Sequence, residues 1–351
     1  MRPRMLELLR ESRGLSQTAL AKASSVPQPT ISKAENGLVE LDADRAERIA
    51  HALQYPLDAF TWDDEIFGLG SANFHHRKQQ SLPVTTLQRI HADVNLHRMR
   101  VVRLLNSVEI EPRYAIPSVD VDELGSPAEV ARAVRAAWNL PMGPIDNMVV
   151  ALERAGALVT HADLYSSKIS ALSQSVPGCP ALLVLNHGMS ADRDRFTLAH
   201  ELGHLVMHTM PTAEADAERE ADEFASEFLM PAREIRGQLN GLDLAGAARL
   251  KPYWKTAMSA LIRRARDLGC IDDGRYKSLN VQISQRGWRK NEPVQIEREA
   301  PSTLRKVIDL HHDEHGYGVG ELAAVVGLHA KEYADRFDDD QRRSRRLRLV
   351  P

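Results

Sequence analysis

Cysteine is scarce in this sequence, and long apolar runs are missing. Cys179 and Cys270 are the two cysteines among 351 residues, too few for a disulfide framework, so we expect a reducing, cytoplasmic compartment. No apolar run approaches the ~18 residues that a membrane span needs. Acids and arginines interrupt the apolar positions of the opening segment MRPRMLELLRESRG. We therefore expect neither a membrane span nor a secretory signal.

An excess of positive charge is also missing. Lys+Arg number 45 and Asp+Glu 48, and the net charge of -3 excludes a uniformly basic coat for nucleic acid but permits a local DNA-reading surface. The length exceeds the roughly 100–200 residues of one domain, which favours two or three domains. We divide the sequence into a helical domain at 1–67, a linker with a long helix at 68–115, a central domain at 116–235, a helical region at 236–337 and an arginine-rich mobile tail at 338–351.

The pattern of apolar residues predicts a mostly helical α+β protein. Three short apolar segments between turn residues, 156–164, 168–176 and 179–186, predict one small β-sheet. The segment 83–108 carries a single apolar stripe with His97 as its polar interruption. This stripe is typical of a connecting helix packed on its own domain, and it also suits a dimerisation surface.

The N-terminal segment LSQTALAKASSVPQPTISKAENG has two short helical patterns joined by a turn. Ser16 is placed to cap the first helix, and the second helix is predicted from about Gln28 to Glu35. Over residues 1 to about 62 the sequence resembles the helix-turn-helix of the Cro and λ-repressor type, the xenobiotic-response-element-like family. Pro29 departs from the usual pattern, but it lies in the first turn, where proline is tolerated.

This resemblance implies that the second helix enters the major groove of DNA. Gln28 is expected to pair with adenine through two hydrogen bonds, while Gln17 and Lys22 would hold phosphates. One such reader binds weakly, so DNA binding implies a homodimer on paired half-sites. The alternative is a protein-docking module that no longer binds DNA. The predicted DNA-contacting residues are Gln17, Lys22, Gln28, Thr30, Ser32 and Lys33.

The segment DRFTLAHELGHLVMH predicts a buried helix that carries an HExxH motif. Positions four apart on a helix lie on one side, so His200 and His204 can hold one zinc ion, with Glu201 beside them as general base. His208 continues the series, but it lies about 12 Å along the axis from His200, too far to share an ion. We expect His208 at the end of the helix or behind a ligand.

The third metal ligand is expected from the acidic helix that follows. Its five glutamates are the candidates: Glu214, Glu218, Glu220, Glu223 and Glu227. Periodicity puts the last three on a charged stripe, whereas Glu218 and Asp222 border the apolar stripe. We therefore predict Glu218 as the third ligand and Asp222 as the acceptor that orients a ligand imidazole. Two histidines, one glutamate and an open position describe a catalytic zinc site.

The run RFTLAHELGHLVMH followed by EREADEFASEFLMP resembles the ImmA/IrrE family of zinc metallopeptidases, over roughly residues 116–290. The resemblance implies a minimal gluzincin-like fold with one Zn²⁺ per chain on His200, His204 and Glu218, and Glu201 as the catalytic base. It also implies limited proteolysis of a helix-turn-helix repressor, which releases genes of stress, phage or mobile-element origin. Because this chain has its own DNA reader, the substrate could be a separate repressor, another copy of the chain, or neither.

The two motifs together predict a cytoplasmic, DNA-binding transcriptional regulator with a zinc-dependent endopeptidase domain. One alternative is a ligand-sensing transcription factor whose metal site is structural or vestigial and whose C-terminal helices hold an effector. Another is an antitoxin-like regulator. Loss of cleavage in Glu201→Gln supports the peptidase, whereas regulation that this change leaves intact supports the ligand sensor.

Two further predictions concern residues around the metal helix. Cys179 begins the last strand before that helix, and a thiol that reached the open metal position would hold the enzyme inactive until oxidised. The alternative is a small buried side chain after a glycine turn. Equal activity of wild type and Cys179→Ser, with and without mild oxidant, would exclude the switch. Spacing selects no oxyanion donor among Tyr165, His161 and His187.

Overall fold

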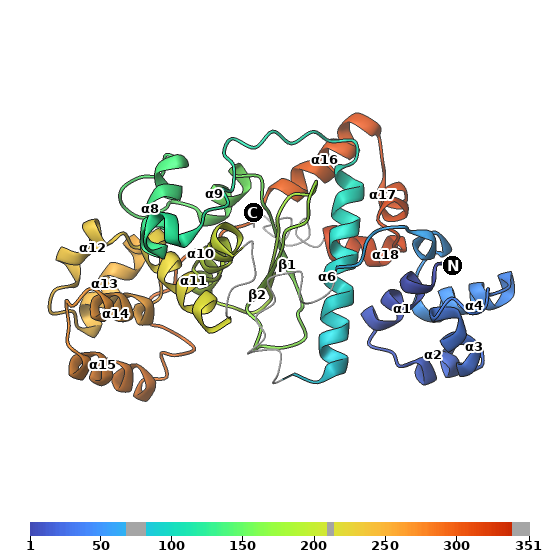
Figure 1. Ribbon diagram of the computed structural model, residues 1–351, viewed down its shortest axis with the longest axis horizontal. Coiled ribbons are helices and arrows are strands. Elements are labelled where there is room, and N and C mark those ends of the chain that lie inside the picture. The colour runs from blue at the N-terminus through green and yellow to red at the C-terminus, as the bar shows by residue number, and fades with distance from the viewer. Residues whose placement is uncertain (68–81, 209–213, 339–351) are drawn as a thin grey trace, which may run out of the picture. The chain divides into compact units, whose positions relative to one another are not determined.

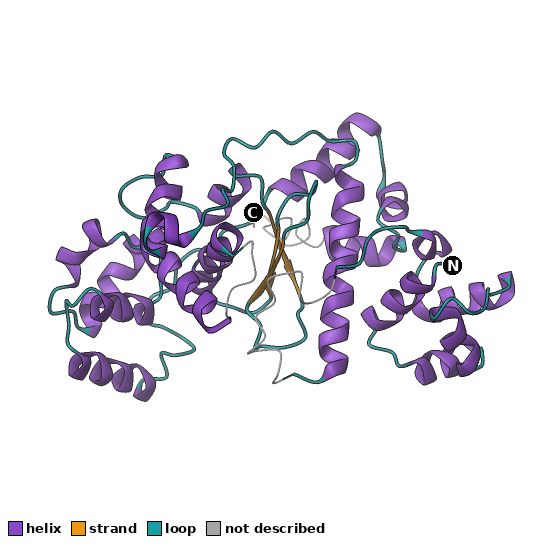
Figure 2. Cartoon of the chain, in the orientation of Figure 1, coloured by secondary structure: helices purple, strands orange, loops and turns teal. Residues whose placement is uncertain are grey.

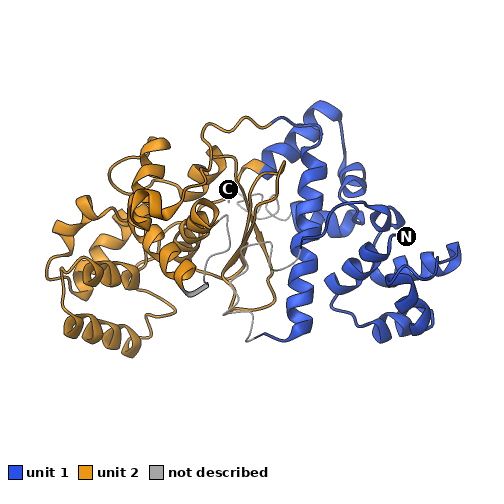
Figure 3. Ribbon diagram, viewed as in Figure 1, with its two compact units in different colours: residues 1–71, 79–109, 304–351 blue, residues 72–78, 110–303 orange. Residues whose placement is uncertain are grey.

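The computed structural model describes residues 1–67, 82–208 and 214–338. The chain divides into two compact units, which Figure 3 colours separately. Unit 1 comprises residues 1–71, 79–109 and 304–351, and unit 2 comprises residues 72–78 and 110–303. Residues 236–337, predicted from sequence as one helical region, are thus divided between the units at residue 303. Residues 339–351 of the predicted mobile tail and residues 68–81 of the predicted linker lie outside the described residues.

Unit 1 is helical throughout its described residues (Figures 1 and 2). Its elements are α1 (Pro3–Ser12), α2 (Gln17–Ser24), α3 (Gln28–Glu35), α4 (Ala43–Leu53), η1 (Leu57–Thr61), α6 (Val84–Leu105), α16 (Thr303–His315), α17 (Val319–Val325), α18 (Ala330–Tyr333) and η2 (Ala334–Asp338). None of the helices in the described part of the chain is long and apolar enough to cross a membrane.

The helix-turn-helix of α2 and α3 forms where the sequence places it. The Ser16 hydroxyl accepts a hydrogen bond from Ala19 N and so caps α2. Ser25 ends α2 with a φ of 53°, a left-handed conformation that turns the chain toward α3. Leu20, Val26 and Ile31 have no exposed surface and form the contact between the two helices.

The apolar stripe of α6 packs inside unit 1. Ile90, Val94, Val101 and Leu104 are at most 3% exposed, and α6 packs against α1. The buried His311 of α16 contacts Leu104 O through its Nε2, at 2.7 Å. Within the described residues, this stripe therefore belongs to the core of its own unit.

The turn between α2 and α3 has a counterpart between α17 and α18. Gly327 in this second turn has a φ of 61°, close to that of Ser25. A Cβ at Gly327 would lie 2.5 Å from the Trp62 ring, so the close approach requires glycine. Buried residues recur 302 positions apart, as in the pairs Leu20 and Leu322, Ser24 and Val326, Val26 and Leu328, and Ile31 and Tyr333. Residues 318–337 thus repeat the pattern of residues 16–35.

The repeated motif carries an acidic side chain at two of the six positions where the first motif has a predicted DNA-contacting residue. Thr30 corresponds to Glu332, and Lys33 corresponds to Asp335. Arg13 donates two hydrogen bonds to the carboxylate of Glu332, at 2.9 and 2.7 Å. Such a two-pronged pair is geometrically specific. The second motif therefore serves as a protein contact within unit 1.

Unit 2 surrounds a three-stranded sheet with helices. Its elements are α7 (Val121–Leu124), α8 (Pro127–Ala137), α9 (Met148–Arg154), β1 (Leu158–Ala162), β2 (Ala171–Gln174), β3 (Leu182–Asn186), α10 (Ala191–Met207), α11 (Glu214–Leu229), α12 (Ala232–Leu239), α13 (Leu244–Trp254), α14 (Met258–Asp267) and α15 (Asp273–Gln285). The strand order is β1-β3-β2, with β3 parallel to β1 and antiparallel to β2. The predicted α+β class is confirmed.

The core of unit 2 positions the HExxH helix. α10 packs against β2, β3 and α11, and α11 packs against α8. Leu198, Leu202 and Val206 of α10 have no exposed surface, as the apolar periodicity of the segment predicts. Because α10 is held on several sides, the side chains that it carries are fixed in place.

Candidate functional site

Two histidines of α10 and one glutamate of α11 meet in unit 2. The Nε2 atoms of His200 and His204 lie 3.1 Å apart. The Glu218 carboxylate lies 3.5 Å from His204 Nε2 and 3.9 Å from His200 Nε2. One donor atom from each residue lies within 4.8 Å of the others. The structure therefore brings together the three residues predicted as metal ligands.

The spacing of these donors fits one small cation. Ligands bonded to zinc at about 2.0–2.2 Å in a tetrahedron stand roughly 3.3 Å from one another. The three observed distances, 3.1, 3.5 and 3.9 Å, lie around that value. Two imidazoles and one carboxylate are also the donor set of catalytic zinc sites, which keep a fourth position open. The residues present thus fit a zinc ion.

Gly203, between the two histidines, sets the distance between α10 and α11. A Cβ at this position would lie 3.1 Å from the Phe224 ring and 3.3 Å from the Cα of Ala221. A side chain there would push α11 away from α10. The glycine of the motif therefore lets Glu218 approach the histidine pair.

Asp222 lies behind His200, where the helical face of α11 predicts it. Its Oδ1 is 3.0 Å from His200 Nδ1, and its Oδ2 accepts a hydrogen bond from Arg263 at 3.3 Å. This contact directs His200 Nε2 toward the other donors. Burial alone would lower the pKa of His200, but hydrogen bonds to Asp222 and Glu218 outweigh burial and raise the pKa to about 9. The surroundings of the cluster therefore favour positive charge.

Asp222→Asn is expected to weaken zinc binding by about 10–100-fold, because the loss of the charge leaves His200 less well oriented and less basic. The measurement is a competition titration with a zinc-selective chelator. Glu223→Gln is the matched control, since it removes the same charge one residue away on α11. Equal zinc affinity in both variants would mean that Asp222 has no role in orienting His200.

His208 and Glu220 extend the cluster behind His204. The Nδ1 atoms of His204 and His208 lie 2.8 Å apart, and His208 Nε2 lies 3.0 Å from Glu220 Oε2. A metal held at Nε2 of His204 would leave the proton on its Nδ1, which would then donate to His208, and His208 would in turn donate to Glu220. His208 lies at the C-terminal end of α10. Through this hydrogen-bonded series Glu220 has an indirect role at His204, which helical periodicity did not suggest.

Glu201 is held by a residue that the sequence analysis did not single out. Its side chain is buried, and its Oε2 accepts a hydrogen bond from Ser173 Oγ at 2.6 Å. Ser173 lies in β2, where every residue is buried. A hydroxyl in such a strand needs a partner, and this is the signal that sequence reasoning could have used. The contact fixes the orientation of the Glu201 carboxylate.

The remaining predicted residues of unit 2 lie in the sheet region. The rings of His161 and His187 are stacked with centroids 5.9 Å apart, and Tyr165 has a φ of 54°. Cys179 lies in the turn between β2 and β3, where its N donates to Val176 O. Within the described residues, the group that could hold a metal ion comprises the two histidines and Glu218 and does not include Cys179. The thiol switch stays a prediction.

The predicted DNA-contacting residues lie on α2 and α3, and two of them are bonded to each other. Gln28 Nε2 donates to Gln17 Oε1 at 2.8 Å, and Gln17 Nε2 donates to Glu35 Oε2 at 2.7 Å. Glu35 also accepts from the buried Arg10 at 2.6 Å. Gln17, predicted as a phosphate contact, thus orients Gln28. The amide of Gln28 has a second N–H and a carbonyl oxygen, the two groups that adenine pairs with.

The other predicted contacts differ in exposure. Lys22 and Lys33 are exposed, as a role at phosphate or base edges requires. Gln28, Thr30 and Ser32 are half-buried along α3. Among the predicted DNA contacts on α3, Lys33 is therefore the exposed side chain.

Comparisons with protein-family models match two parts of the chain. A helix-turn-helix model matches residues 6–60, and the model of the IrrE N-terminal-like domain, a peptidase family, matches residues 152–266. The second match contains α10 and α11 with all the residues of the metal cluster. No curated protein matches the chain. The chain thus joins a region that matches a helix-turn-helix model to a region that matches the model of the IrrE N-terminal-like domain, as its motifs predicted.

Proposed function

We propose that this protein is a DNA-binding transcriptional regulator whose unit 2 is a zinc-dependent endopeptidase. The observation that carries the proposal is the cluster of His200, His204 and Glu218 with the buried Glu201 beside it. A structural zinc site would close with four protein ligands. Three metal ligands with an oriented carboxylate beside them are typical of a site that catalyses hydrolysis.

The chain's own residues would divide the work of peptide hydrolysis. His200, His204 and Glu218 would hold zinc, which when bound supplies Lewis acidity to a water and to a peptide carbonyl. Glu201 would take the proton from the attacking water and pass it to the leaving amine. Ser173 would keep the Glu201 carboxylate in one orientation during both transfers.

The substrate that suits this chain is a helix-turn-helix repressor, either a separate protein or another copy of the same chain. A repressor-like domain in the same chain as the peptidase domain supports this choice, because a reader of operator DNA would bring the peptidase to proteins bound at the same sites. The proposal includes a homodimer on paired half-sites and a cytoplasmic location, where the operator lies.

The test is an incubation of the zinc-loaded full chain with purified helix-turn-helix repressors and, separately, with a second tagged copy of itself. Mass spectrometry is expected to show one discrete new fragment pair, which a chelator abolishes. Intact protein in every incubation, with zinc still bound, would contradict the peptidase assignment.

The DNA reader is expected to lose operator affinity in Gln28→Ala and in Lys33→Ala. A two-pronged contact to a base is worth about 1–3 kcal/mol of discrimination, so the Gln28 change should also relax sequence preference at one base pair. The measurement is binding to operator variants at one fixed salt concentration. Lys22→Ala, at a predicted phosphate contact, should weaken binding to all operator variants by the same factor. Unchanged binding by the first two variants would remove α3 as the reading helix.

A further inference from the structure

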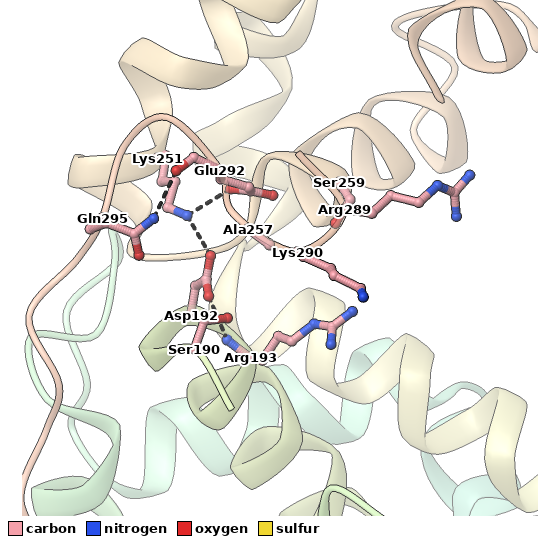
Figure 4. Close-up of a pocket in the computed structure, with 10 residues that line it drawn as sticks. All are labelled: Ser190, Asp192, Arg193, Lys251, Ala257, Ser259, Arg289, Lys290, Glu292 and Gln295. Atoms are coloured by element: carbon pink, nitrogen blue, oxygen red, sulfur yellow. Dashed lines mark hydrogen bonds and ion pairs between the residues drawn. The ribbon is translucent and has the colours of Figure 1, made fainter. Parts of the chain in front are cut away.

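A polar pocket lies in unit 2 at the N-terminal end of α10 (Figure 4). His200 and His204 lie further along the same helix. The start of α10, the end of α13, the start of α14 and the segment after α15 line it. Its empty volume is about 330 Å³, part of which is open to solvent.

One wall of the pocket is a buried set of three charges. The Lys251 side chain is 2% exposed, and its Nζ lies 2.5 Å from Asp192 and 2.6 Å from Glu292. Glu292 Oε2 also accepts a hydrogen bond from Met258 N at 3.0 Å, at the start of α14. This wall is held in place because the ion pairs of Lys251 tie three segments together, and with two carboxylates against one ammonium it keeps one excess negative charge.

The other side of the pocket carries three cations. Arg193, Arg289 and Lys290 are exposed, and Figure 4 shows their side chains directed away from the Lys251 ion pairs toward the same side. Among the described residues, none of these three side chains forms an ion pair. The three cations outnumber the one excess negative charge of the Lys251 wall, so the lining as a whole is positive. The pocket therefore attracts anions.

We propose that this pocket binds the phosphate group of a small anionic molecule. Guanidinium groups pair with phosphate oxygens through two parallel hydrogen bonds, and a lysine adds a point charge. Ser259 supplies a hydroxyl donor in the same lining, whereas the Ser190 hydroxyl already bonds the Asp192 carboxylate. The charged and polar lining favours inorganic phosphate, a diphosphate or the phosphate end of a nucleotide over a large apolar ligand.

The pocket touches two elements that lead to the metal cluster. Arg193 lies in the first turn of α10, the helix that carries His200. α14 begins at the pocket and carries Arg263, which contacts Asp222 and through it His200. A bound anion would therefore add stability to α10, and the thermal unfolding temperature of the protein should rise with anion concentration.

The test is calorimetric titration of the zinc-loaded full chain with inorganic phosphate, pyrophosphate and ADP, at constant ionic strength because exposed charges are screened by salt. We expect one saturable site per chain, and at least tenfold weaker binding in Arg193→Gln and in Lys290→Gln. Tighter binding of ADP than of phosphate would identify an organic phosphate, and equal affinity would identify free phosphate. Arg233→Gln, an exposed cation on α12 outside the pocket, should bind as the wild type does.

Three results would overturn the proposal. The first is the absence of saturable binding for all three probes. The second is an equal loss of affinity in Arg233→Gln, which would indicate attraction to the overall charge. The third is binding that survives in both pocket variants but disappears in His204→Ala, which would place the anion at the metal cluster.

Discussion

Glu201→Gln is expected to lower the cleavage rate by about 10²–10⁴-fold while zinc stays bound, because the change removes the proton acceptor and leaves the three metal ligands in place. The amide keeps the shape of the carboxylate and can still accept the hydrogen bond from Ser173. Cleavage of the repressor found in the incubation experiment is the readout, with zinc content measured on the same samples. Slow cleavage with zinc still bound would identify Glu201 as the general base.

The control for this variant is Glu223→Gln on α11, which removes one negative charge outside the cluster and should cleave at the wild-type rate. Cleavage by Glu201→Gln at that same rate would show that another group takes the proton. If Glu201→Gln stops cleavage in the test tube but gene regulation in cells is unchanged, the ligand-sensing alternative describes the biological role.

Zinc binding is expected to be lost when any one of His200, His204 or Glu218 is replaced. With two ligands remaining, the loss of zinc affinity should exceed the 10–100-fold expected of Asp222→Asn. These changes remove a bond to zinc, whereas Asp222→Asn disturbs only the orientation of a ligand. His204→Ala and Glu218→Gln should each be purified with far less than one zinc per chain, measured by atomic emission, whereas the wild type should carry one.

Glu220→Gln and Glu223→Gln are the matched controls for Glu218→Gln. Glu223→Gln should keep full zinc, and Glu220→Gln should show a smaller loss, since Glu220 acts through His208 and His204. Circular dichroism checks that each variant is folded. Zinc retained in Glu218→Gln but lost in Glu220→Gln would show that the argument from the helical face is wrong.

Local sequence pattern was sufficient for the elements and for the position of residues within one helix. The cap at Ser16 and the bounds of α3 follow from side-chain chemistry within a few residues. The spacing of His200 and His204 puts them on one side of α10, and the helical period of α11 separates Glu218 from Glu220. These are short-range properties, and helical geometry converts them directly into positions in space.

Contacts between elements were decided by the tertiary structure alone. Ser173 reaches Glu201 across 28 positions of sequence, and Gln17 is drawn into a network that reaches Glu35. Glu227, which periodicity puts on a charged stripe, is 2% exposed because Arg132 and Arg264 pair with it. No local period encodes which distant side chain will neutralise a buried charge, since that depends on how the helices pack.

The division of the C-terminal helices shows the same limit. The apolar spacing of residues 318–337 predicts helices, but the sequence by itself did not show that they return to unit 1 and repeat its helix-turn-helix. That return depends on the Arg13–Glu332 pair and on the close approach of Gly327 to Trp62. The sequence thus determined the helices, the strands and the metal-ligand spacing, because each follows from backbone geometry over a few residues. Tertiary structure decided the partners of the buried polar groups, because burial makes an unsatisfied group costly and packing selects which partner satisfies it.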